Sequence, residues 1–110
     1  MTVCNRLVVT GRVANIRQRF FRPDGSSVTE FSLELDDQEP SSPRSDRTAI
    51  DAVAFDSVVG LKPDQLQPGQ HLWVEGRLKQ RRWRTPEGKL RSRIEVIVTE
   101  LRWVNEDEGD

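Results

Sequence analysis

The sequence predicts an all-β domain: a small barrel of five strands, with one short helix between the third and fourth strands and a long basic β-hairpin near its end. Five segments rich in β-branched and aromatic residues alternate, fully or partly, between apolar and polar side chains. Combinations of Pro, Asp and Gly that favour turns separate several of them. The length of 110 residues, 35% of them hydrophobic, matches one domain with a small core.

The first two strands should form a hairpin. Residues 5–21 read as a long first strand, and Gly11 inside it suggests a bulge or a bend. Residues 22–25, Arg-Pro-Asp-Gly, are a strong turn signal, because Pro presets one backbone dihedral and Gly is free to take a positive φ. Apolar and polar residues then alternate over residues 28–35, which predicts a half-buried second strand.

An acidic loop should separate this hairpin from the third strand. Residues 36–47 contain two Pro and three Ser but no aliphatic residue. They cannot bury enough apolar area to offset the entropy of ordering them, so we expect a mobile loop. Residues 48–55 return to strand chemistry, and Asp56 is a favourable N-cap for a short helix through residue 61, which Pro63 would limit.

Residues 71–83 and 90–104 predict the fourth and fifth strands, joined by a turn at residues 85–88, Thr-Pro-Glu-Gly. This order of two strands, a loop, a strand, a short helical insert and a long hairpin is the layout of an OB-fold, a small and partly open barrel. We therefore expect one OB-fold domain over residues 1–104, followed by a short acidic tail, residues 105–110.

Charge is unevenly distributed along the chain. The net charge is -1, yet residues 76–93 hold eight Lys and Arg against only Glu87, a local charge of +7. Strand parity places Trp83 on one face with alternate cations, and such a surface suits single-stranded nucleic acid, whose bases stack on aromatic rings while cations neutralise the phosphates. Alternatively, Trp83 folds over its own hairpin and the cations are a solvated face. The candidate binding residues here are Trp83, Arg77, Lys79, Arg81, Arg82 and Arg84.

Three stretches of the chain resemble one known family. They are NRLVVTGRV at residues 5–13, RPDG at 22–25 followed by FSLE at 31–34, and VEGRLKQRRW at 74–83. Their order and spacing are similar to those of the bacterial single-stranded DNA-binding proteins, including the short primosomal replication protein N branch. The resemblance extends from residue 5 to residue 104. It implies an OB-fold, single-stranded DNA as the ligand, and assembly into homodimers or homotetramers.

The resemblance also assigns roles to individual residues. Trp83 and Phe55 fall on family positions whose aromatic rings stack with bases. Lys79, Arg81 and Arg82 fall on the basic residues of the family's long hairpin. The resemblance therefore implies that the hairpin and the end of the third strand together form the DNA-binding surface.

One departure from the family pattern directs attention to the first strand. Ala49 stands where many members have a second stacking Trp, so base stacking should be weaker here or move partly to Phe20 and Phe21. These two rings have opposite parity, and we expect Phe21 to be the exposed one that contacts DNA. Three cations of the same strand either line the binding groove or pair with the acidic loop. They are Arg12, Arg17 and Arg19.

Other kinds of chemistry have little support in the sequence. His71 and Cys4 are too few ligands for a structural zinc site, so we expect neither a metal nor a cofactor. The chain has no Gly-rich phosphate loop and no evident pairing of a nucleophile with a base, so we do not expect an enzyme. A lone Cys, the lack of a signal sequence and the lack of an apolar span predict a soluble protein of the bacterial cytoplasm, associated with the nucleoid and not with a membrane.

Two functional hypotheses follow. The first is a protein that binds single-stranded DNA without sequence specificity, in replication, replication restart or repair, with other replication or replication-restart proteins as partners. RNA stays open as a ligand, because charge and stacking do not test the 2′-hydroxyl group. The second is an OB-fold protein-interaction module of a primosome-type replication complex with weak or secondary DNA binding, which Ala49 and the acidic total favour.

Overall fold

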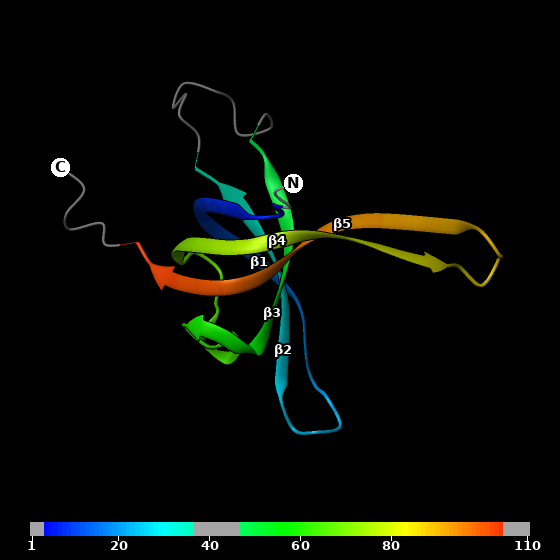
Figure 1. Cartoon of the computed structure of the whole chain (residues 1–110), viewed down its shortest axis with the longest axis horizontal. Coiled ribbons are helices and arrows are strands. Elements are labelled where there is room, and N and C mark those ends of the chain that lie inside the picture. The colour runs from blue at the N-terminus through cyan, green and yellow to red at the C-terminus, as the bar shows by residue number, and fades with distance from the viewer. Residues whose placement is uncertain (1–3, 37–46, 105–110) are drawn as a thin grey trace.

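The computed structural model describes residues 4–36 and 47–104, which form a closed barrel of five strands (Figure 1). The strands are β1 (Leu7–Phe21), β2 (Ser27–Leu35), β3 (Ala49–Gly60), β4 (His71–Arg84) and β5 (Leu90–Trp103). One 3-10 turn, η2 (Pro63–Gln65), lies between β3 and β4. The predicted all-β fold class and OB-fold layout are confirmed, with a barrel that is closed instead of partly open. In the described part of the chain, no helix has the length and apolar character needed to cross a membrane.

Strand order around the barrel is β1-β2-β3-β5-β4, and β4 closes the ring by pairing with β1. The pairs β1–β2, β2–β3, β1–β4 and β4–β5 are antiparallel, whereas β3 and β5 run parallel. The last strand of the sequence therefore lies between β3 and β4 and joins two parts of the chain that do not pair with each other.

Alternate side chains of the strands fill the barrel. Phe31 and Leu33 of β2, together with Leu72 and Val74 of β4, are fully buried. The rest of the core comes mainly from β3, from β5 and from the segment after η2: Ala52, Ala54, Val58, Leu66, Val96, Val98 and Leu101. Because strand side chains alternate between two faces, the residues between these core positions face outward. That outward face carries the candidate site.

The bulges of β1 are not at Gly11, where the sequence suggested one. They fall between Val13 and Asn15 and between Ile16 and Gln18, where the pairing with β2 shifts. At Gly11 the pairing is regular, but a Cβ atom there would lie 2.3 Å from the carbonyl oxygen of Glu34. Glycine is thus needed for the close approach of β1 and β2. In a sequence, a glycine inside a strand indicates either such an approach or a bulge, and the two cannot be told apart.

The predicted helix over residues 56–61 is wrong. β3 continues through Gly60, and after an irregularity Val59 and Gly60 pair with β5. Gly60 has a φ of +92°, and only glycine fits there because a Cβ would lie 2.0 Å from the Leu101 carbonyl oxygen. The helical turn comes later, at Pro63. Strand pairing and the β-branched Val58 and Val59 override the capping signal of Asp56.

The β4–β5 hairpin projects from the barrel as a two-stranded ribbon (Figure 1). Pairing with β1 ends at Gly76 of β4, and pairing with β3 begins at Val96 of β5, so the residues between them pair only with the opposite strand of the hairpin. Most of the predicted loop, residues 37–46, and the acidic tail, 105–110, lie outside the described residues.

Candidate nucleic-acid interface

A groove runs over the outer face of the barrel at the base of the β4–β5 hairpin. It consists of three adjoining hollows of about 270, 210 and 490 Å³. Arg81 borders the first two hollows, and Phe55 and Ile97 border the last two, so neighbouring hollows share lining residues. The groove leads from Trp83 on the hairpin, past Phe55 of β3, to Arg77 and Val59.

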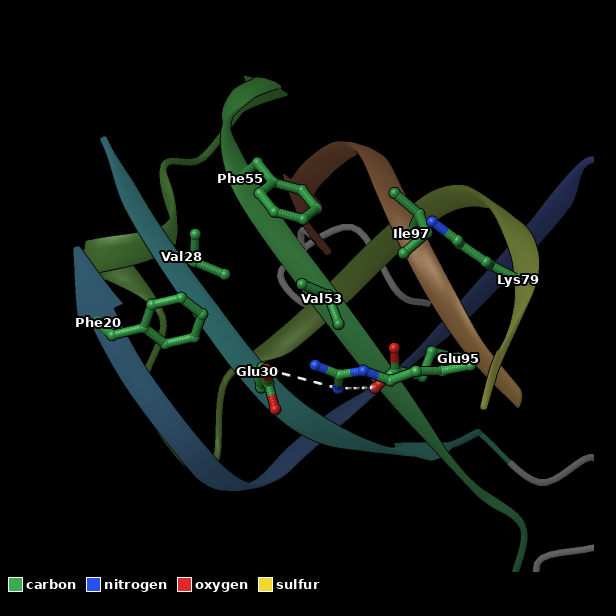
Figure 2. A pocket seen from close by; sticks show the side chains of 9 residues that line it. Phe20, Val28, Glu30, Val53, Phe55, Lys79, Glu95 and Ile97 are labelled. Carbon is green, nitrogen blue, oxygen red and sulfur yellow. Dashed lines mark hydrogen bonds and ion pairs between the residues drawn. The ribbon is translucent and has the colours of Figure 1, made fainter. Parts of the chain in front are cut away.

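The middle hollow has an apolar end and a charged end (Figure 2). Figure 2 shows Phe20 and Phe55 on one side and the carboxylates of Glu30 and Glu95 at the other. Five strands contribute to its lining, which comprises Phe20, Val28, Glu30, Val53, Phe55, Lys79, Arg81, Glu95 and Ile97. Strand register explains this convergence, because Val28 lies opposite both Phe20 of β1 and Phe55 of β3.

The Phe55 ring is held at the groove by its neighbours. The Arg22 guanidinium group lies 5.0 Å from the ring centroid, within the range of a cation–π interaction. Next to Phe55, Asp56 accepts hydrogen bonds from the Ser27 backbone N–H at 2.8 Å and from the Ser27 hydroxyl group at 2.6 Å. These hydrogen bonds lower the pKa of Asp56 below its ordinary value, with the hydroxyl contributing most. They tie the β1–β2 hairpin to β3 beside the ring.

Trp83 lies on the outer part of the hairpin and keeps 41% of its surface exposed. The Arg93 guanidinium group is 5.6 Å from its ring centroid, and Arg91 is its cross-strand partner. The ring therefore contacts its own hairpin, as one sequence interpretation expected, while it remains exposed enough to stack, as the other expected. Both of the aromatic residues that the family resemblance singled out carry an arginine of this chain nearby.

Four side chains that line the groove, Glu30, Arg81, Arg93 and Glu95, belong to a closed ring of six alternating charges, which we call the charge ring. Each of its three arginines lies within 4.0 Å of two carboxylates, and each carboxylate within 4.0 Å of two arginines. All five strands contribute to it. In order around the ring, its members are Glu30, Arg17, Asp51, Arg93, Glu95 and Arg81.

The charge ring is loosely closed. Its shortest contact, 3.3 Å from Arg81 Nη1 to Glu95 Oε2, is a hydrogen bond, and the other contacts span 3.7–4.0 Å. Two buried donors, Nη1 of Arg17 and Nε of Arg93, have no hydrogen-bond partner among the described residues. Three acids thus balance three arginines in charge, and only one of the six contacts within the ring is a hydrogen bond.

The remaining hairpin cations divide between two faces. Arg77 and Lys79 line the groove together with Arg81 and share the face of Trp83. Arg82 and Arg84 have the opposite parity; Arg82 donates to the side chain of Gln80, and Arg84 donates to the carbonyl of Gly88 in the turn. The long guanidinium side chains of these two residues lie on the other side of a thin ribbon.

The first-strand candidates lie in different places. Arg17 is part of the charge ring, and its ion-pair partners among the described residues are Glu30 and Asp51. Arg12 borders a separate hollow together with Glu34 and Arg47. Arg19 is exposed on β1 opposite Thr29 and is absent from the lining of the groove.

Neither of the two adjacent phenylalanines is in the core. Phe21 is 76% exposed, as expected, but does not line the groove; Phe20, 37% exposed, does. Sequence reasoning also missed Arg22, Arg91 and Arg93. Arg22 lies just after β1 and Arg93 pairs with Arg81 across the hairpin, so their contacts with Phe55 and Trp83 could not be read from the sequence.

Within residues 4–36 and 47–104, no three His, Cys, Asp or Glu side chains are grouped so that they could hold a metal ion. The acids of the charge ring come no closer together because an arginine stands between each pair. The chemistry available in the groove is therefore that of exposed rings, cationic side chains and a charge-neutral polar floor. This combination suits the stacking of planar rings next to bound phosphates.

Comparisons with known proteins point to one family and one fold. The model of the single-strand binding protein family matches residues 4–104. The chain is 26% identical over 108 residues to a single-stranded DNA-binding protein of Thermotoga maritima, covering 96% of this chain and 77% of that protein. It is 25% identical over 108 residues to a single-stranded DNA-binding protein of Aquifex aeolicus, covering 96% and 73%. The solved Plasmodium falciparum SSB complex with ssDNA has a TM-score of 0.71 at 20% identity, covering 96% of this chain and 98% of that one, which supports the fold.

Proposed function

This chain belongs to the single-strand binding protein family, and we propose that it binds single-stranded DNA along the groove, with bases stacked on Trp83 and Phe55. Members of this family are DNA-binding proteins without enzymatic activity, so a catalytic role is ruled out by family, as expected. The observation that carries the proposal is the series of adjoining hollows from Trp83 to Phe55 and Arg77, which are lined by aromatic rings and cations.

Bases and phosphates take different parts of this surface. Base stacking on an aromatic ring contributes about 1–3 kcal/mol per base and tolerates every sequence, because every base has a π-face. A base stacked on the exposed side of Trp83 would complete a stack that already contains the Arg93 guanidinium group. Phosphates are held by cations that are not part of the charge ring: Arg22, Arg77, Lys79 and Arg91, with Arg82 and Arg84 reaching the strand from the far face.

The proposal assigns the protein to DNA replication, replication restart or repair, in the bacterial cytoplasm, as a homodimer or homotetramer. Ala49, where many relatives have a stacking Trp, is exposed at the start of β3 and does not line the groove. Phe20, at the apolar end of the middle hollow, supplies an aromatic surface close to Phe55 instead. Phe20 of β1 thereby partly compensates for the aromatic ring that is missing at position 49.

Titration with an oligo-dT strand at low and high salt, followed by tryptophan fluorescence, tests the proposal. The native chain should bind with strong quenching that weakens with salt, because each neutralised phosphate releases counterions. Trp83→Ala should lose most of the quenching and about 5- to 150-fold in affinity, the loss of one stacked base. Trp103→Ala removes a ring that is 54% exposed at the end of β5 and is the matched control, expected to keep the affinity.

Two outcomes would count against this account. Undiminished affinity in Trp83→Ala would mean that stacking on the hairpin is not the mechanism of binding. Absence of any binding to oligo-dT at low salt would reject the proposed function and favour the second hypothesis, in which the basic hairpin serves a protein partner of a replication complex.

A further inference from the structure

The Trp83 ring lies on a part of the hairpin that strand pairing does not fix to the barrel. Beyond Gly76 of β4 and Val96 of β5, the two strands pair only with each other (Figure 1). A two-stranded ribbon without further packing is only marginally stable in water. The position of Trp83 relative to Phe55 on β3 therefore depends on side-chain contacts between the hairpin and the barrel.

Arg93 makes such a contact. Its Nη1 lies 3.8 Å from Oδ2 of Asp51 on β3, and its Nε lies 3.7 Å from Oε2 of Glu95. Two carboxylates thus attract different nitrogens of one planar guanidinium group, which restrains the plane of that group. The same group lies 5.6 Å from the centroid of the Trp83 ring. Arg93 therefore connects a strand of the barrel with the face of the proposed stacking ring.

The barrel end of this connection is itself held in place. Asp51 Oδ1 accepts a hydrogen bond of 3.2 Å from the hydroxyl group of Ser32, its cross-strand partner on β2, and lies 3.7 Å from Nη1 of Arg17. Its second oxygen, Oδ2, is the one that faces Arg93. Asp51 and Phe55 also share one parity on β3. One strand of the barrel therefore carries the Phe55 ring directly and restrains the other stacking ring through Asp51.

We infer that Arg93 is a positioning residue for DNA binding, which holds the Trp83 ring, through Asp51, in a fixed orientation before a strand arrives. The inference rests on the proposed function, since it specifies how a stacking ring of the same groove is prepared. Ordering one mobile side chain on binding weakens affinity by about 2- to 12-fold. A Trp83 ring that is already restrained on one face avoids most of this loss and leaves its other face for a base.

This role depends on the shape of the guanidinium group and not on its charge alone. A guanidinium group is planar and stacks on an aromatic face while its nitrogens reach carboxylates, whereas an ammonium group is a compact point charge. Arg93→Lys therefore keeps the charge of the groove and removes the connection. The matched control is Arg102→Lys, because the Arg102 guanidinium group lies 4.9 Å from the centroid of the Trp73 ring, and neither residue lines the groove.

A double-mutant cycle on the full chain tests the role, with the anisotropy of a dye-labelled oligo-dT strand as the readout. Arg93→Lys should weaken binding about 2- to 12-fold in the native background but by less than about twofold in the Trp83→Ala background, because a role that acts through the ring disappears with the ring. A loss of equal size in both backgrounds would mean that Arg93 contacts DNA directly and would overturn the inference. Arg102→Lys should keep the native affinity, and a loss as large as that of Arg93→Lys would also overturn it.

Fluorine NMR of the unbound protein, labelled with fluorotryptophan, reads the orientation of the ring itself. The chain contains three tryptophans, Trp73, Trp83 and Trp103, whose resonances are assigned by single Trp→Phe substitutions. Arg93→Lys should shift the Trp83 resonance and leave the other two in place, whereas Arg102→Lys should shift that of Trp73. A Trp83 resonance that stays in place in a folded Arg93→Lys protein would overturn the inference.

A second variant acts at the barrel end of the connection. Asp51→Asn removes the charge that attracts Arg93 without changing any atom in contact with the Trp83 ring, and it too should shift the Trp83 resonance. It decides the question if Arg93→Lys fails to fold, and an unchanged resonance in it would overturn the inference. Absence of oligo-dT binding by the native chain would instead reject the proposed function, and the resonances of the unbound protein distinguish that failure from a failure of the connection.

Discussion

The β4–β5 hairpin has an inner part, up to the pair Arg81 and Arg93, and an outer part, residues 82–92. Both parts are rich in arginine, but their arginines differ in whether they pair with carboxylates. In the inner part, Arg81 and Arg93 belong to the charge ring, and the ring as a whole is neutral. In the outer part, residues 82–92, four cations stand against only one acid, a net charge of +3. Those four cations are Arg82, Arg84, Lys89 and Arg91.

The difference teaches that a count of cations does not measure a binding surface. The inner arginines hold five strands together and leave little net field, whereas the outer ones pair with no carboxylate in the described contacts. A polyanion responds to the local field. The ring arginines of the inner part should therefore matter most for stability, and the cations outside the ring should matter most for electrostatic attraction of DNA.

The largest expected effect is on stability. Glu95→Ala would leave Arg81 and Arg93 without their common partner on the floor of the groove. Breaking a buried ion pair costs about 3–5 kcal/mol, and partial exposure of both arginines reduces this to about 2 kcal/mol in the free energy of unfolding. Urea unfolding measures it. Glu87→Ala in the outer part should leave the free energy of unfolding within about 0.5 kcal/mol of the native value, and equal losses in both variants would erase the distinction.

A smaller effect concerns the salt dependence of DNA binding in the outer part. Arg91 lies opposite Trp83 on the same face, whereas Arg82 is on the other face of the ribbon. Arg91→Gln should reduce the slope of log affinity against log salt by about 0.7, the value for one phosphate contact to a single strand. Fluorescence titration with oligo-dT at several salt concentrations gives the slope. Lys89→Gln, at the hairpin turn outside the groove, is the matched control and should change the slope less; an equal change in both variants would contradict a phosphate contact at Arg91.

The smallest effect concerns the β1–β2 hairpin, which is anchored where the β4–β5 hairpin is not. Hydrogen bonds from Ser27 lower the pKa of Asp56, so the folded state favours the ionised carboxylate. This contribution to stability is present above the ordinary pKa and is lost as the pH falls through the lower pKa of the folded state. Asp56→Asn should therefore show a flatter fall of the urea midpoint between neutral pH and about pH 3 than the native chain. Identical curves would mean that the anchor contributes nothing.

The fold was largely predictable because its signals are local. Turn residues and alternation located all five strands, each within three residues of its start in the structure. The helix after β3 was misplaced because Gly60 and Val59 are held by pairing with β5, a contact between distant parts of the sequence. Local capping chemistry at Asp56 gave no information about that contact.

The site residues could be predicted only where the alternation of side chains along one strand decides which face a residue occupies. The exposed face of Trp83, Arg81 and Lys79 followed from alternation along one strand. The partners across the hairpin did not: the predicted turn at residues 85–88 is confirmed by the hydrogen bond from the Gly88 N–H to the Thr85 carbonyl, but sequence reasoning left the register of the flanking strands open. Since a shift of one residue moves every side chain to the other face, the position of Arg91 opposite Trp83 was not accessible.

The charge ring was out of reach of sequence reasoning for a related reason. Its members come from five strands and meet only after the barrel closes. In the sequence, Glu30 reads as an ordinary outward-facing acid of an alternating strand. Its burial depends on Arg17 and Arg81, which reach it from the two hairpins.

The position of β5 between β3 and β4 also bears on how the chain reaches its native state. A nascent chain that has completed β4 holds two strands with unsatisfied edges, and neither can pair with the other in the native way until the last strand arrives. The parallel β3–β5 pairing closes a long loop, a slow step in folding. Closure of the native barrel therefore requires β5, and before it is synthesised the edges of β3 and β4 that it covers lack their native partner.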